Sequence, residues 1–131
     1  MLESLYIENF AIINQVQIDF HSGMTVLTGE TGAGKSIIID AIGQLLGQRT
    51  QPNFVKENRD YAYIEGVFTS NEKINTLLDE MHIPSDTQLI VSKKITKDGK
   101  PSIKINYRST TQMLLKTVMS NLVDIHSQFE T

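Results

Sequence analysis

The sequence predicts an α/β fold with a substantial antiparallel β portion. One segment has the order strand, glycine-rich turn, helix, which is typical of a parallel crossover unit. Several other segments alternate apolar and polar residues with a period of two, and an Asp-Gly turn joins two of them, which indicates antiparallel pairing. The chain has 131 residues and 40% hydrophobic side chains, enough for one modest domain with its own core.

Three strands are expected before the first helix. The first places Leu5 and Ile7 in phase, and the second places Val16 and Ile18 in phase. The third, Met24–Thr28, is a short continuous apolar run, which predicts a buried strand.

The pattern G-x-x-x-x-G-K-[ST] follows this run and ends at Ser36. Gly29, Gly32 and Gly34 let the backbone turn tightly, so that its N–H groups come close to a phosphate. Lys35 supplies a positive charge for the β- and γ-phosphates, and the Ser36 hydroxyl is placed to bind Mg²⁺. The sequence therefore predicts a phosphate-binding loop for a nucleoside triphosphate.

The helix after this loop is expected over 37–46 and is apolar nearly all round, which predicts that it is buried. Its positive dipole end points at the same anion. Residues 48–60 are polar and contain Pro52, and they are expected to form a loop. The backbone N–H groups expected to contact phosphate belong to Gly32, Ala33, Gly34 and Ile37.

A strand over 61–69 and an amphipathic helix over 71–81 come next. The strand has Ala62, Ile64 and Phe68 on one face. Either Ser70 or Asn71 is expected to cap the helix. The apolar residues recurring at i, i+3, i+4 and i+7 are Ile74, Leu77, Leu78 and Met81.

An antiparallel hairpin is expected from Leu89–Thr96 and Ser102–Tyr107, with Asp98 and Gly99 in its turn. This 93–108 hairpin could touch DNA as a basic ribbon, although charges on an antiparallel strand are more often a solvated face. Its cations are Lys93, Lys94, Lys97, Lys100, Lys104 and Arg108. Ser109 and Gln112 then have capping-box spacing ahead of a final helix.

Composition limits the classes of function. The net charge of −3 gives no general support for nucleic-acid binding, so a DNA contact has to be local. The absence of cysteine excludes disulfides and cysteine metal sites. No apolar run approaches the roughly 20 residues of a membrane span, and the start of the chain lacks a signal-peptide pattern. A cytoplasmic protein with no membrane partner is expected.

Hydrolysis needs an apolar strand that ends in an Mg²⁺-binding Asp, often followed by a catalytic Glu. The nearest candidate is Asp124 in Asn121–Ile125, but only two apolar residues directly precede it and no Glu directly follows it. The guanine-reading Asn-Lys-x-Asp motif is absent. The chain therefore has the features of part of a nucleotide-binding fold.

Three segments carry a family resemblance. Leu5–Ile12 resembles the L-x-I-x-N-F opening of SMC-like ATPase heads. Residues 21–47 are similar to the RecN family of bacterial DNA-repair proteins, and residues 122–130 resemble the segment around the Q-loop glutamine of that family. The three segments occur in the family order over nearly the whole chain.

The resemblance implies a P-loop NTPase fold of the ABC/SMC-type head, with residues 1–131 as its N-terminal lobe. The phosphate loop is then 29–36 and the Q-loop region 122–130, while the coiled coil and the C-terminal half of the head are absent. The implied cofactors are ATP and Mg²⁺. The implied partners are the C-terminal half of its own head, a second head in a homodimer, and DNA and recombinase through the full-length protein. Double-strand break repair and recombination at the bacterial nucleoid are the implied setting.

Two further site residues come from this resemblance. Gln128 matches the Q-loop glutamine, which in the family contacts Mg²⁺ and the attacking water, although Ser127 and Phe129 depart from the family's usual Gly and His. Arg49 resembles the arginine of SMC-like heads that reaches nucleotide or DNA, and a planar guanidinium suits phosphate. The alternative for Arg49 is a solvent-facing loop residue.

Two other classes of function remain open. One is a small self-contained NTPase or kinase that uses Asp124 as its Mg²⁺ aspartate. The other is a DNA-binding module that works through the 93–108 hairpin. On the family interpretation the parent protein is an ATPase, and this chain alone binds ATP without efficient turnover.

Overall fold

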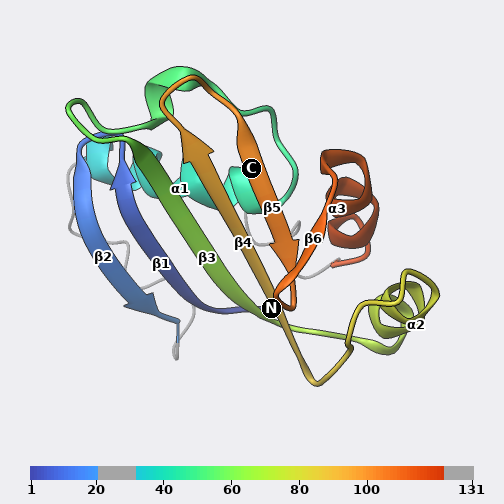
Figure 1. The fold of residues 1–131 in the computed structure, drawn as a ribbon. Helices are drawn as coiled ribbons and strands as arrows, with labels where there is room; N and C mark the ends of the chain where they lie inside the picture. The colour runs from blue at the N-terminus through green and yellow to red at the C-terminus, as the bar shows by residue number, and fades with distance from the viewer. Residues whose placement is uncertain (21–31, 123–131) are drawn as a thin grey trace.

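The computed structural model describes residues 1–20 and 32–122. This part of the chain forms a six-stranded antiparallel sheet with three α-helices and one short 3₁₀ helix (Figure 1). In chain order the elements are β1 (Leu2–Phe10), β2 (Ile13–Asp19), α1 (Gly32–Leu45), η2 (Pro52–Phe54), β3 (Tyr61–Thr69), α2 (Glu72–Glu80), β4 (Gln88–Thr96), β5 (Pro101–Ile105), β6 (Arg108–Thr110) and α3 (Gln112–Met119).

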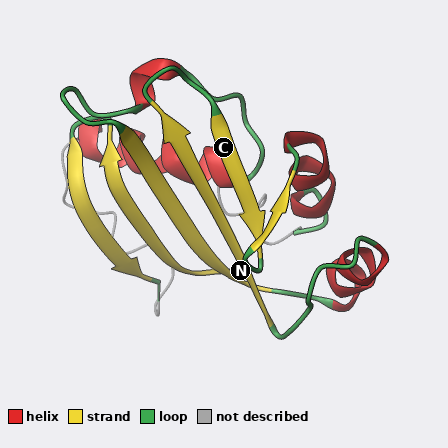
Figure 2. Ribbon diagram, viewed as in Figure 1, coloured by secondary structure: helices red, strands yellow, loops and turns green. Residues whose placement is uncertain are grey.

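The strand order is β2-β1-β3-β4-β5-β6, and every neighbouring pair is antiparallel. Helix α1 crosses one face of the sheet, whereas no described helix lies across the opposite face (Figure 2). Helix α3 packs beside β5, and α2 contacts α3. The expected α/β fold with a large antiparallel portion is confirmed.

The core lies between α1 and the covered face of the sheet. Alternation along the strands turns Leu5, Ile7, Ile64, Val91 and Ile105 to this face, where all five are fully buried. The expected period-2 strands are therefore confirmed. The side chains of α1 that are buried with them are Ile38, Ala41, Ile42 and Leu45.

Helix α1 differs from its expectation in its start, which is Gly32 instead of residue 37, and in its burial. Its sheet-facing side is buried, but Ile39 is 41% exposed and the neighbouring Asp40 is exposed as well. A helix that packs on one sheet buries only the side turned to that sheet. The prediction that α1 is buried is thus confirmed for its sheet-facing side and was wrong for Ile39 and Asp40.

The ends of the other two helices are capped by side chains. Asn71 is the N-cap of α2, because its Oδ1 accepts a hydrogen bond from the Ile74 N–H at 2.8 Å. Thr111 begins α3 by accepting from the Leu114 N–H at 3.2 Å. The capping-box prediction for Ser109 was wrong, because Ser109 lies in β6.

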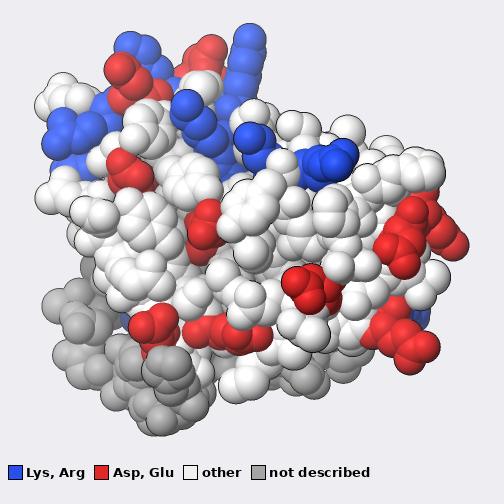
Figure 3. Space-filling view, turned by 60° about the horizontal axis from the view of Figure 1, so that its bottom comes forward, with Lys and Arg blue, Asp and Glu red and all other residues white. Residues whose placement is uncertain are grey.

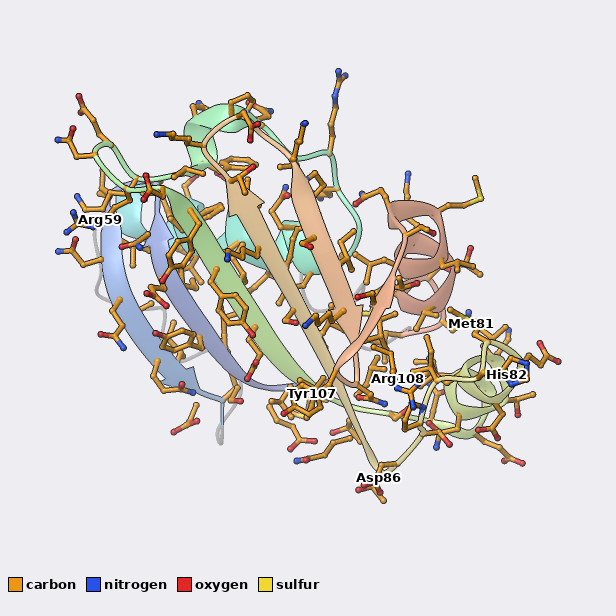
Figure 4. All side chains as sticks on the ribbon, viewed as in Figure 1. Arg59, Met81, His82, Asp86, Tyr107 and Arg108 are labelled. Carbon is orange, nitrogen blue, oxygen red and sulfur yellow. The ribbon has the colours of Figure 1, made fainter. Side chains whose placement is uncertain are left out.

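The strand expected to reach Tyr107 ends two residues earlier. Asn106 and Tyr107 have φ angles of 48° and 70°, and Ile105 pairs with Arg108 directly across this two-residue turn. Figure 4 shows Tyr107 and Arg108 at this point of the fold. The chain reverses here to add β6, which the sequence pattern did not reveal, because tyrosine is not a usual turn residue.

Some predictions fall outside the described part of the chain. They are the strand Met24–Thr28, Gly29 of the phosphate loop, and the segment that contains Asp124 and Gln128. Within residues 1–20 and 32–122, no helix is long and apolar enough to cross a membrane.

Candidate nucleotide-binding site

The first turn of α1 is the described part of the predicted phosphate loop. The helix begins at Gly32, so the end of the G-x-x-x-x-G-K-[ST] pattern is already helical. Backbone N–H groups in a first helical turn point along the axis toward any ligand at that end, and the helix dipole adds partial positive charge there. No residue of this turn is acidic. The turn therefore has the electrostatics that an anion requires.

Two side chains next to this turn carry the expected chemistry. Lys35 and Ser36 are both exposed, so the ammonium and the hydroxyl are open to a ligand. Gly34 and Ile37 are half-buried beside them. A lysine and a serine at a helix N-terminus fit a phosphate group and its Mg²⁺, and the residues present are thus compatible with Mg²⁺–ATP.

Close packing with the sheet fixes the position of α1. Gly66 of β3 lies beneath Leu45, and a Cβ at Gly66 would come within 2.6 Å of Leu45 Cδ1. The missing side chain therefore allows the helix to approach β3 closely. This contact lies at the C-terminal end of α1 and sets how closely that end approaches β3.

The C-terminal end of α1 has a defined turn. Gly47 has a φ of +98°, and the Gln48 N–H donates to the Gly43 carbonyl at 3.0 Å. A 6→1 bond of this kind with a left-handed residue is the Schellman motif. Lys116 of α3 packs against Gly47, and a Cβ there would lie 2.4 Å from Lys116 Cγ. Gly47 is thus required by both its backbone angle and its neighbour.

Arg49 follows this turn and is exposed. Helix α1 has 14 residues, which corresponds to a length of roughly 20 Å. Arg49 therefore lies at the opposite end of α1 from Lys35 and Ser36. The structure brings together the predicted residues of the first turn, but it does not bring Arg49 to them.

Lys93 was expected on the solvated face of the basic hairpin, and the structure corrects this. Its side chain is fully buried on the covered face of β4, in phase with Leu89, Val91 and Ile95. Burial disfavours the charged form and lowers the pKa of Lys93 from 10.5 to about 8. The period-2 pattern of β4 was a signal that could have placed this lysine inside.

The uncovered face of the sheet carries tyrosine–glutamate pairs. Tyr6 and Tyr61 donate to the two carboxylate oxygens of Glu8 at 3.1 and 2.9 Å, and Tyr63 donates to Glu65 at 2.8 Å. Burial, followed by the hydrogen bond to Glu65, raises the pKa of Tyr63 to about 12. This face is polar, and among the described residues those predicted to bind nucleotide, Lys35 and Ser36, belong to α1 on the other side of the sheet.

Comparison with known proteins places this geometry in a family. A family model described as an AAA domain matches residues 4–129. The DNA repair protein RecN of Halalkalibacterium halodurans is 44% identical over 133 residues, which cover 99% of this chain and 24% of that protein. RecN of Bacillus subtilis is 41% identical, with coverage of 99% and 23%. The chain thus spans about a quarter of the length of the curated relatives it matches.

Solved structures share the fold at low sequence identity. A structure described in work on ATP-driven dimerization and DNA-stimulated activation of SMC ATPases matches with a TM-score of 0.75 and 20% identity, over 99% of this chain and 84% of that chain. The SMC head domain from Thermotoga maritima matches with a TM-score of 0.60 and 21% identity, over 88% and 41%. The recombination mediator RecF matches with a TM-score of 0.64 and 18% identity, over 88% and 29%.

The chain has a P-loop NTPase fold of the type seen in SMC heads. The chain belongs to the AAA domain family. Its resemblance to the RecN proteins, which the sequence motifs indicated, is confirmed over nearly its whole length.

Proposed function

We propose that this chain is the N-terminal part of an ABC-type ATPase head, and that it binds ATP with Mg²⁺ in a protein that acts in DNA repair. The observation that carries the proposal is the first turn of α1, which contains no acidic residue and places exposed Lys35 and Ser36 at a helix N-terminus. Support for the repair role comes from the RecN relatives.

In this proposal the chain supplies the phosphate contacts and leaves other tasks to partners. Lys35 binds the β- and γ-phosphates, Ser36 holds Mg²⁺, and Gln128 orients the attacking water. The C-terminal half of the head and a second head complete the site, so ATP joins two heads and hydrolysis releases them. DNA and recombinase are met through the full-length protein, in the bacterial cytoplasm and at the nucleoid.

Titration calorimetry with Mg²⁺–ATP tests the phosphate site. Lys35→Ala removes a charged donor to phosphate, and such contacts are worth about 1.5–3 kcal/mol, so the affinity is expected to fall about tenfold or more. Lys73→Ala is the matched control, because Lys73 is an exposed lysine in the first turn of α2. Unchanged affinity in Lys35→Ala, or an equal loss in Lys73→Ala, would contradict the proposed site.

The metal has a separate test. Ser36→Ala is expected to weaken ATP binding in the presence of Mg²⁺ and to leave binding in EDTA unchanged, because only the hydroxyl ligand to the metal is lost. An equal loss with and without Mg²⁺ would assign Ser36 to phosphate rather than to metal.

Arg49 is proposed to contact a phosphate other than those held by the first turn of its own α1. Its exposure and its position at the other end of the helix support this. The two sources of such a phosphate are duplex DNA and the nucleotide of a second copy. Separate titrations of Arg49→Ala with duplex DNA and with Mg²⁺–ATP distinguish them.

A second candidate function is DNA contact through the 93–108 hairpin. Apart from the buried Lys93, the cations of the hairpin are exposed, and Figure 3 shows Lys and Arg gathered along one edge of the molecule. Lys56, Arg59 and Lys97 also line a hollow at one end of the sheet, but Glu57 and Asp60 line it too. The mixed charge makes this a weaker candidate than the phosphate site.

Salt-dependent DNA binding tests the second candidate. Charge reversal of Lys97 and Lys100 together is expected to reduce DNA affinity and to flatten its dependence on salt, since fewer counterions are then released. Charge reversal of Lys73, which is exposed on α2, is the control. Binding that is insensitive to salt and to both changes would remove this candidate.

A further inference from the structure

Lys93 occupies an unusual place in the sheet. In the row of directly paired residues that crosses the covered face, it stands between Ile64 of β3 and Ile103 of β5. Both neighbours are buried and apolar. A lysine in such a row loses its hydration, which costs free energy unless other groups replace the water. The hydrogen bonds of its ammonium therefore indicate which part of the fold the lysine stabilises.

The ammonium is satisfied by neutral oxygen atoms at the end of α1. Lys93 Nζ donates to Gln44 Oε1 at 3.2 Å and to the Gln48 carbonyl at 3.5 Å. Among the residues that the structure describes, no carboxylate is paired with it. Both acceptors belong to the C-terminal end of α1, where the helix dipole also favours a cation.

Three consecutive backbone carbonyls after α1 accept hydrogen bonds from three different elements. Gln112 of α3 donates to the Gly47 carbonyl and, at 3.2 Å, to the Gln48 carbonyl. Lys93 of β4 donates to the Gln48 carbonyl. Gln44 of α1 donates to the Arg49 carbonyl at 2.9 Å. The backbone that leads into and through Arg49 is thus held from three sides.

Gln44 connects these contacts. Its side chain is only 1% exposed, and its Oε1 accepts from the Thr50 hydroxyl at 2.9 Å as well as from Lys93. The Gln44 amide therefore bonds to three groups: the Lys93 ammonium, the Arg49 carbonyl and the Thr50 hydroxyl. The Arg49 side chain itself is exposed.

We infer that Lys93 is a positioning residue: together with Gln44 and Gln112 it fixes the backbone of 47–50, so that Arg49 projects from the end of α1 in one orientation. The use of that orientation for phosphate binding rests on the proposed function. The ordering of the segment does not, because it depends only on the contacts of the buried side chains. A preorganised backbone reduces the entropy that Arg49 loses when it binds a ligand.

Hydrogen exchange of two matched amides in the full chain tests this inference. The Gln48 N–H closes the turn after α1 by bonding to Gly43, and the Ile83 N–H closes the same kind of turn after α2 by bonding to Leu78 at 2.9 Å. His82, labelled in Figure 4, has a φ of 60° and corresponds to Gly47. The two turns therefore share a geometry, but only the first is held by a buried lysine.

Lys93→Met keeps an unbranched side chain one heavy atom shorter than lysine and removes its donors. Exchange at Gln48 is expected to accelerate about tenfold, because a charged hydrogen bond to the segment is lost, while exchange at Ile83 stays unchanged. Lys94→Met, at an exposed position on the other face of β4, is expected to change neither amide. Equal acceleration at both amides, or none at Gln48, overturns the inference.

A second variant covers the case in which Lys93→Met fails to fold. Gln112→Ala removes the donor at the start of α3 without changing a charge, and it is expected to accelerate Gln48 exchange and not Ile83 exchange. Duplex DNA or Mg²⁺–ATP, whichever Arg49 contacts, provides the functional readout. In the Lys93→Met background, Arg49→Ala is expected to cost less affinity than it costs in the parent chain.

The exchange result and the binding result can fail separately. Unchanged ATP affinity in Lys35→Ala would contradict the proposed function and leave the exchange result standing. Unchanged Gln48 exchange in a folded Lys93→Met, or in Gln112→Ala where Lys93→Met does not fold, would contradict the positioning role even if ATP binding is confirmed.

Discussion

At the scale of single residues, Lys93 shows how a charge is kept inside this fold. In place of water, the Lys93 ammonium hydrogen-bonds to Gln44 Oε1 and the Gln48 carbonyl, which are both neutral acceptors. Neutral acceptors compensate a buried charge less completely than a carboxylate does, so the protonated form remains disfavoured. The lowered pKa of Lys93 is the measurable sign of that cost.

This cost predicts a rise in stability with pH. The pKa of Lys93 is about 8 in the folded chain and has its ordinary value near 10.5 in the unfolded chain. Between these values the unfolded state binds more protons, so the free energy of unfolding is expected to increase by about 2 kcal/mol from pH 7 to pH 9.5. Urea unfolding at both pH values measures it, and Lys93→Met is expected to remove the increase.

Lys94→Met provides the control for this prediction, because Lys94 is the exposed neighbour on the same strand. It is expected to keep the full rise with pH. A parent chain whose stability is equal at pH 7 and pH 9.5 would show that Lys93 is not held with a lowered pKa. The raised pKa of Tyr63 opposes the trend only above about pH 10, where unfolded tyrosine ionises.

At the scale of elements, the position of α1 on the sheet depends on one residue of β3. Gly66 leaves room for Leu45 Cδ1, and an added Cβ would also lie 3.0 Å from Phe68 Cε1. Leu45 and Phe68 are both fully buried, so neither can move aside without disturbing the core. The orientation of the turn that is proposed to bind phosphate is therefore coupled to the packing at the other end of its helix.

Gly66→Ala is expected to destabilise the chain by about 1–3 kcal/mol, through overpacking between α1 and β3. Urea unfolding measures the loss. In a Leu45→Ala background the same change is expected to cost less, because the clashing methyl group is gone. Additive effects of the two substitutions would show that the strain arises elsewhere.

The elements also show what the sequence could and could not predict. Local signals were sufficient for α2, whose apolar residues repeat with the helical period and whose cap is Asn71, and for the Asp98–Gly99 turn. They failed where tertiary contacts decide the outcome. Strand β6 follows a turn through Asn106 and Tyr107 that Asn106 stabilises by accepting from the Ile90 N–H at 2.8 Å, a contact 16 residues away.

For the candidate site, too, the sequence was sufficient for local features but not for those that depend on tertiary contacts. The Lys35–Ser36 motif is local, so its spacing on one helical turn could be read from the sequence. The buried position of Lys93 depends on which face of β4 turns to the core. A charged residue suggests the exposed face, unless the alternation of the whole strand is followed from Leu89 to Ile95. The position of Arg49 relative to α1 could not be predicted from the sequence. It depends on the turn at Gly47, which sets the direction of the chain after the helix.

At the scale of the whole molecule, the proposed function makes the chain one part of a larger ATPase head. The match to the RecN protein of Halalkalibacterium halodurans covers 99% of this chain but 24% of that protein. In the proposed function, the carboxylates of hydrolysis and the contacts of a second head lie in the remainder. The phosphate site and the catalytic machinery are thereby expected to be separable.

This separation predicts binding without turnover. The folded chain is expected to bind Mg²⁺–ATP and to show no turnover above the Lys35→Ala background at any protein concentration. Phosphate release over a range of chain concentrations measures it, next to a binding titration of the same sample. Turnover that is first order in protein and absent from Lys35→Ala would establish a complete small NTPase instead.

The place of β1 in the sheet has a consequence for synthesis on the ribosome. β1 pairs with β2, which follows at once, but its other edge pairs with β3, which begins at Tyr61. The connection between Asp19 and Tyr61 carries the phosphate loop and α1. At about 5–20 residues per second, that edge waits roughly 2–8 s for its partner. During this interval the edge of β1 that carries Leu5 and Ile7 is open, and it can pair with a strand of another chain.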